Sequence, residues 1–159
     1  MTIPLVPAVG RTVLAGVLLL ALGACSGDDE KEGSVFSIEP GQCFLAPEEV
    51  EAQISDLEQV DCQDEHDHEA YAVIRYKAPG AEEASDEFPG DEALTKFADG
   101  SCAADFGDYV GVDYLDSSLF FTYLLPSPRS WQEDDRSVVC LVTSAGGEPL
   151  TGSAKGTEQ

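Results

Sequence analysis

The chain is poor in basic residues. Only 8 lysines and arginines stand against 31 aspartates and glutamates among 159 residues, and the formal net charge at pH 7 is −23. No local cluster of lysine or arginine offsets this charge. Because such a surface repels the phosphates of nucleic acids and anionic lipid headgroups, we expect no nucleic-acid partner.

Long apolar runs are also missing. The longest, Val13 to Leu22, has about ten residues, whereas a membrane-spanning helix needs about 20. Arg11 precedes this run and the acidic sequence of residues 28–30 follows it, which is the arrangement of an export signal. We expect residues 1–24 to be a signal peptide that is removed on export.

The end of this segment resembles the cleavage box of a bacterial lipoprotein. Leu22 stands three positions before Cys25, with two small residues between them. The Cys25 thiol would carry a diacylglycerol and become the mature N-terminus, and two or more acyl chains, such as palmitate, hold a protein at a membrane. We therefore expect a lipid-anchored protein on the outer face of the cell membrane. Ordinary cleavage after Gly23, which would release a soluble protein, is the alternative.

The other four cysteines predict two disulfides, because the chain is expected in an oxidising compartment. Four cysteines allow three pairings. We favour Cys43 with Cys62 and Cys102 with Cys140, since neighbouring cysteines most often close neighbouring structural units. The absence of any Cys-x-x-Cys pair argues against a structural zinc site.

The remaining chain is long enough for one domain. We expect an acidic tether over residues 25–35, a folded domain over 36–152 and a flexible tail over 153–159. Apolar alternation and turn residues predict strands and short helices in an irregular order. The strands are expected at residues 35–38, 71–76, 119–125 and 137–143. A short helix is expected at 47–54, and a helical turn at 128–135 with Ser127 as its cap.

One long helix is predicted by residues recurring at spacings of three and four. They are Leu94, Phe97, Ala98, Cys102, Phe106 and Tyr109, with Asp91 as the expected cap. These elements together predict a small single α+β domain with an antiparallel sheet, one main helix packed on it and two disulfides.

Several motifs resemble the septum-formation domain family. They are Gly41-Gln-Cys43-Phe44, Val60-Asp-Cys62, His66-Asp67, Glu69-Ala-Tyr71, Pro89-Gly90, Tyr109-Val110-Gly111, and Pro126 to Trp131 with Arg136 and Val139-Cys140. The family usually has a proline where this chain has Glu65, and a glycine before the arginine where it has Asp134 and Asp135. The resemblance implies an exported, membrane-tethered protein linked to division septa, in a family without an established biochemical activity.

The histidines lie in the one patch where metal chemistry is conceivable. His66 and His68 would point the same way on a strand, and Asp67 or Glu69 could complete a zinc site. The interpretation we favour is that His66 and Asp67 fix a turn by hydrogen bonds while the other acids are solvated. We therefore expect no metal and no cofactor.

Trp131 and Arg136 could form a stacking platform for a cell-wall sugar or peptide. A tryptophan in this position is more often packed in the core against a disulfide, and we favour that interpretation. Whether a small-molecule ligand exists is left open by the sequence.

No catalytic residues are predicted. The chain has no Gly-x-Ser-x-Gly elbow and no phosphate-binding glycine loop, and each cysteine is assigned to lipid or disulfide. We expect a non-catalytic binding or scaffolding protein whose partners are envelope or division proteins. The alternative is a cation-dependent cell-wall ligand binder, or an envelope enzyme, that uses His66 and His68.

Overall fold

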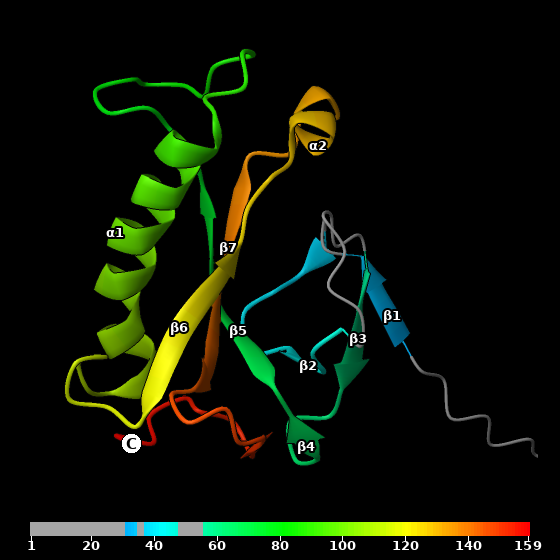
Figure 1. Ribbon diagram of the computed structural model, residues 1–159, viewed down its shortest axis with the longest axis vertical. Helices are drawn as coiled ribbons and strands as arrows, with labels where there is room; N and C mark the ends of the chain where they lie inside the picture. The colour runs from blue at the N-terminus through cyan, green and yellow to red at the C-terminus, as the bar shows by residue number, and fades with distance from the viewer. Residues whose placement is uncertain (1–30, 35–36, 48–55) are drawn as a thin grey trace, which may run out of the picture.

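A curled antiparallel sheet forms the body of the protein (Figure 1). The computed structural model describes residues 31–34, 37–47 and 56–159. Within them the elements follow in the order β1 (Lys31–Ser34), β2 (Cys43–Phe44), β3 (Asp56–Val60), β4 (Glu65–His66), β5 (His68–Arg75), α1 (Asp91–Val110), β6 (Leu119–Leu124), α2 (Pro128–Gln132), β7 (Ser137–Ser144) and β8 (Leu150–Thr151). Six strands pair in the order β1-β3-β2-β5-β7-β6, and β4 pairs with β8 in a separate small sheet.

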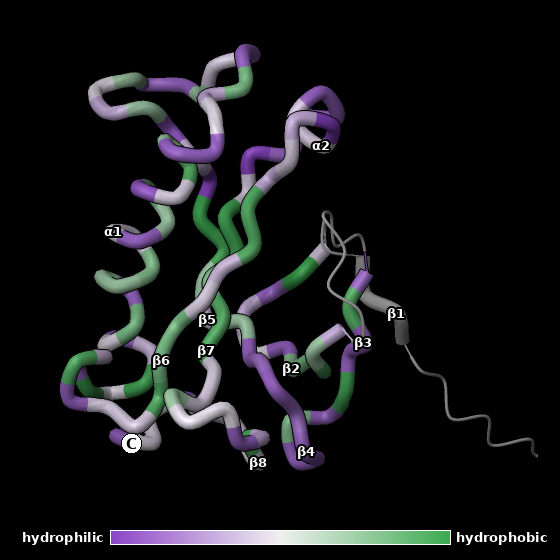
Figure 2. The backbone as a smooth tube through the Cα atoms, viewed as in Figure 1, coloured by the Kyte–Doolittle hydropathy of each residue, from purple (hydrophilic) through white to green (hydrophobic). Residues whose placement is uncertain are grey.

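The sheet has two apolar faces, each covered by a different part of the chain. Helix α1 lies against β5, β6 and β7, while β1, β2 and β3 curl toward the other side (Figure 1). Along β7, Val138, Cys140 and Val142 belong to the cluster that includes α1. Val139 and Leu141 belong to the cluster that includes β2 and β3. Figure 2 shows hydrophobic residues along β5 and β7. The prediction of an antiparallel α+β domain is confirmed.

Helix α1 buries the side that its apolar spacing predicts. Leu94, Ala98, Cys102, Phe106 and Val110 are buried. The expected cap is wrong by one position, because Gly90 is the N-cap, with φ 89°, and no side chain caps the helix. Asp91 instead stands in the first turn, where a carboxylate interacts favourably with the helix dipole.

A β-bulge in β5 changes which residues face the helix. Ala70 and Ala72 pair with consecutive residues of β7, so Tyr71 is the extra residue. Tyr71 therefore lies on the helix side with Ala72 and Ile74, and not with Val73 as strict alternation predicts. Its hydroxyl donates a hydrogen bond of 2.7 Å to the Cys102 carbonyl of α1. The bulge thus connects β5 to the helix.

Both predicted disulfides are confirmed. Cys43 pairs with Cys62, which fastens β2 to the residues just after β3. Cys102 pairs with Cys140, which fastens α1 to β7. For closed loops of 19 and 38 residues, loop-closure entropy would stabilise the fold by about 3 and about 4 kcal/mol.

Three expectations for the strands and helices need correction or lie outside the described residues. The first strand is β1, within the predicted tether, and Ser37 and Ile38 are not in a strand. The strand over 119–125 is present as β6, but it is an edge strand whose side chains are mostly half-buried. The helix expected near 47–54 lies almost wholly within residues 48–55, which are outside the described residues.

The part of the chain that is described contains no helix both long enough and apolar enough to cross a membrane.

Candidate functional site

The last seven residues pack against the end of α1. The amide of Gly156 donates to the Tyr109 carbonyl and the amide of Glu158 to the Val110 carbonyl, each at 2.9 Å. These carbonyls belong to the last turn, where a helix has no internal donors left. Gly111 ends the helix with φ 98°, and Glu158 passes so close that a side chain at Gly111 would meet its Cγ at 3.0 Å.

The prediction of a flexible tail over 153–159 is therefore wrong. Ala154 is buried, and the segment supplies backbone donors to the helix end. Its polar, glycine-containing sequence gives little sign of this because, apart from the buried Ala154 and the Ser153 hydroxyl, the contacts are made by backbone amides.

Glu69 joins this tail to the sheet. Its side chain is fully buried on β5. Oε1 accepts hydrogen bonds from the Tyr109 hydroxyl at 2.7 Å and the Ser153 hydroxyl at 2.5 Å, and Oε2 accepts one from the Ala154 amide at 2.6 Å. These donors replace the water that burial removes. Burial, and then the hydrogen bond to Glu69, raises the pKa of Tyr109.

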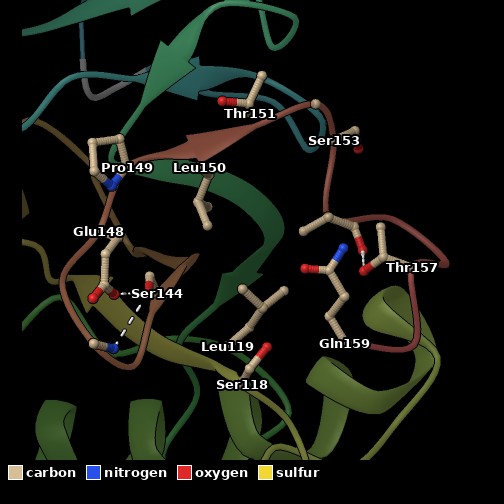
Figure 3. A pocket seen from close by; sticks show the side chains of 13 residues that line it. Ser118, Leu119, Ser144, Glu148, Pro149, Leu150, Thr151, Ser153, Thr157 and Gln159 are labelled. Carbon is tan, nitrogen blue, oxygen red and sulfur yellow. Dashed lines mark hydrogen bonds between the residues drawn. The ribbon is translucent and has the colours of Figure 1, made fainter.

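A pocket of about 390 Å³ opens beside the tail (Figure 3). Leu119 and Leu150 point into it, between Glu148 on one side and Gln159 on the other. Ser144 donates a hydrogen bond of 3.1 Å to Glu148. The residues that line the pocket are Ser118, Leu119, Ser144, Gly146, residues 148–154, Thr157 and Gln159. They include no histidine, cysteine or basic side chain. The pocket thus offers carboxylate, hydroxyl and amide groups around an apolar floor, which suits binding of a polar chain segment.

The two histidines lie on different strands. His66 lies on β4, which pairs with β8, whereas His68 begins β5, which pairs with β2. Nδ1 of His66 lies 2.9 Å from the Asp64 carbonyl, and Asp67 accepts a hydrogen bond of 2.7 Å from the Ala46 amide. The hydrogen bonds therefore fit the interpretation in which His66 and Asp67 fix a turn.

Burial lowers the pKa of His68, with the nearby Asp67 charge acting in the opposite direction. Nδ1 of His68 and Nε2 of His66 are both buried without a hydrogen-bond partner among the described residues. His66 also stands in a second grouping. Cys43, His66 and Glu69 can each offer one atom to a metal ion. These three atoms lie within 4.8 Å of one another, and all three residues are buried. In this structure the Cys43 sulfur is held in a disulfide.

Trp131 and Arg136 are packed in the interior. Their exposed fractions are 2% and 4%. The guanidinium carbon lies 3.9 Å from the centre of the Trp131 ring, and the indole Nε1 donates to the Asp86 carbonyl at 3.1 Å. Tyr76 and Phe88 meet the same ring edge-on. The structure therefore does not offer Trp131 as a stacking platform, and its neighbours are these aromatic rings rather than a disulfide.

The packed tail and the residues that line the pocket were not predicted from the sequence. Glu69 was the available signal, because a carboxylate beside the apolar residues of a central strand needs hydrogen-bond donors. The sequence does not show where the donors lie, since Ser153 and Ala154 stand 84 and 85 residues further along.

A sequence model of the family described as septum formation matches residues 40–159. The chain belongs to the septum formation family. The matched region contains both disulfides, Glu69 and every residue that lines the pocket. It includes the tail that packs on α1 and leaves β1 outside. No curated protein and no solved structure matched the chain.

Proposed function

We propose that this member of the septum formation family is a lipid-anchored extracytoplasmic protein that serves as a non-catalytic binding or scaffolding module at the division septum. The observation that carries the proposal is the family match over residues 40–159, which supports a division-related role. The lipoprotein-type box ending at Cys25 supports anchorage. The two disulfides support an oxidising compartment outside the cytosol.

Binding rather than catalysis is favoured by how the polar side chains are used. Glu69, Asp67 and Arg136 each hold neighbouring backbone in place. In the pocket, Ser144 is hydrogen-bonded to Glu148 with no histidine in the lining to act as a base. These groups are arranged to support the fold and to offer a mixed polar and apolar recess.

The proposed partner is an envelope or division protein with a basic, flexible segment. A formal charge of −23 attracts cationic segments and increases their rate of encounter. The exposed Glu148 at the pocket provides a local partner for a lysine or arginine, beside apolar contacts from Leu119 and Leu150. The anchor would keep this recognition close to the membrane.

The test is the position of the protein in dividing cells. We expect the full chain, with a fluorescent protein joined after Gln159, to concentrate at new septa. A fusion of residues 1–35 alone should label the membrane evenly, because it carries the anchor and tether without the domain. Cys25→Ala should disperse the signal from the membrane. An even peripheral signal from the full chain, equal to that of the 1–35 fusion, would contradict the proposal.

A further inference from the structure

The buried group of Cys43, His66 and Glu69 has the chemistry of a metal site. A sulfur, an imidazole nitrogen and a carboxylate oxygen lie within 4.8 Å of one another. Ligand atoms around a tetrahedral zinc ion stand about 3.5 Å apart, given bond lengths of about 2.0 to 2.3 Å. A shift of about 1 Å would bring the three atoms to that spacing.

His66 is oriented as a ligand would be. Nδ1 lies 2.9 Å from the Asp64 carbonyl, so the Nδ1 proton is the one donated to the backbone. The other nitrogen, Nε2, then carries a free lone pair, and it is buried without a partner. Metal-binding histidines typically have their second nitrogen fixed in this way. A fully buried imidazole with an unused lone pair is costly unless something engages it.

Glu69 has one acceptor position left. A carboxylate offers about four lone-pair positions. Two hydrogen bonds use Oε1 and one uses Oε2, which leaves capacity on Oε2. The donors also fix the orientation of the carboxylate, as the surroundings of metal ligands commonly do.

The disulfide decides whether sulfur is available. A disulfide sulfur is not the thiolate that zinc binds. Reduction of Cys43–Cys62 would produce a Cys43 thiolate beside His66 and Glu69. It would also free the Cys62 thiolate, whose sulfur is bonded to the Cys43 sulfur in the oxidised form and could supply a fourth ligand. We propose that the dithiol form of this domain binds one zinc ion through Cys43, Cys62, His66 and Glu69. The site goes beyond the proposed function, and it exists only while the disulfide is open.

The geometry also indicates which disulfide a reductant reaches. Cys62 is partly exposed, whereas Cys43, Cys102 and Cys140 are fully buried. A dithiol reductase would attack Cys62 Sγ with one thiolate, and the electron pair of the S–S bond would move to Cys43 Sγ. Its second thiol would then displace Cys62, so the reductase becomes a disulfide and the domain gains two thiolates. Zinc binding keeps both deprotonated.

The test uses the full chain carrying Cys25→Ser, so that thiols come only from the domain. It is reduced with a phosphine, which becomes the phosphine oxide, and the reagent is removed before Co²⁺ or Zn²⁺ is added without oxygen. We expect one Co²⁺ per chain, with the thiolate charge-transfer and tetrahedral bands of a cobalt–sulfur centre. The oxidised chain should bind less than about a tenth as much.

Two variants separate a formed site from loose binding by thiols. His66→Asn should weaken metal binding by at least about 100-fold, whereas the matched control His68→Gln should stay within about threefold. Both are first checked in the oxidised form for wild-type circular dichroism and absence of free thiols. Equal retention in both variants would show that the cysteines alone bind the metal, and equal losses would show that the effect is not specific to His66; either result would overturn the proposal.

X-ray absorption on the reduced wild-type protein gives a result that does not depend on any variant. The zinc form should fit two sulfur ligands and two nitrogen or oxygen ligands. A shell of four sulfurs, a shell without sulfur, or no bound metal would each overturn the proposed ligand set.

Discussion

Glu69 lies beside the apolar residues of a central strand, and its hydrogen-bond donors are distant along the chain. Tyr109 is 40 residues away and Ala154 is 85. The sequence could therefore indicate that this carboxylate needs donors without showing which residues provide them. Asp134 is a different case. Its φ of 67° is a conformation that favours glycine, although an aspartate stands there.

Replacing Glu69 with glutamine should destabilise the oxidised domain. The amide group would place a donor against the donors of Tyr109, Ser153 or Ala154 and leave at least one of them unsatisfied. We expect a loss of about 1 to 3 kcal/mol in the free energy of unfolding, measured by urea denaturation. The exposed Glu65→Gln is the matched control, expected within about 0.5 kcal/mol of wild type. Equal stability of the two variants would argue against the anchoring role.

The pKa of His68 predicts a dependence of stability on pH. Burial lowers this pKa below its ordinary value of 6.5, so between the two values the unfolded chain binds a proton that the folded chain does not. Stability should therefore fall as the pH drops below about 6.5, and His68→Gln should remove part of that slope. Denaturation at pH 7.5, 6.5 and 5.5 (about one-unit steps around the ordinary pKa) measures it. Parallel slopes in the two proteins would contradict the assignment to His68.

The spacing of apolar residues in the sequence predicted some helices and strands better than others. The spacing of Leu94, Ala98 and Cys102 predicts α1 because one helix face packs on one sheet. The bulge at Tyr71 was not predictable, since it depends on pairing with a strand that follows about 65 residues later. The role of the tail was hidden for a related reason, because backbone amides cap α1 and every residue except proline can supply one.

Removal of residues 153–159 should weaken the domain at the end of α1. The deletion takes away two backbone donors to the helix and two of the three donors to Glu69. We expect a loss of about 2 to 4 kcal/mol, together with faster hydrogen exchange in the last turn of α1 than in its first half. Lys155→Ala, which keeps every backbone bond of the tail, is the control. An unchanged unfolding midpoint after the deletion would refute the capping role.

For the molecule as a whole, the sequence predicted the fold class and both disulfides. The order of the cysteines favoured this pairing without deciding it, since four cysteines allow three pairings. The bridges join β2 with the residues just after β3, and α1 with β7, which follows β6 and α2 along the chain. The pocket could not be predicted, since its walls come from the start of β6, the end of β7, the turn leading into β8, β8 itself and the tail, which meet only in the folded chain.

Crosslinking tests whether the pocket faces a partner. A photo-crosslinking residue at Glu148, in growing cells, should capture a protein with a basic segment, and added salt should reduce the yield. The same residue at Glu133, an exposed acid on the turn after α2, is the matched control and should capture much less. Equal capture from both positions would show that the pocket is not the contact.

The central claim is that an exported domain, anchored through Cys25, holds its other four cysteines in two disulfides. Intact-mass measurement on protein extracted from native membranes, after alkylation of free thiols, tests it most directly. We predict a chain beginning at Cys25, with the added mass of a diacylglycerol and no alkylated cysteine. A chain that retains residues 1–24, carries no lipid and is alkylated at all four domain cysteines would contradict the claim.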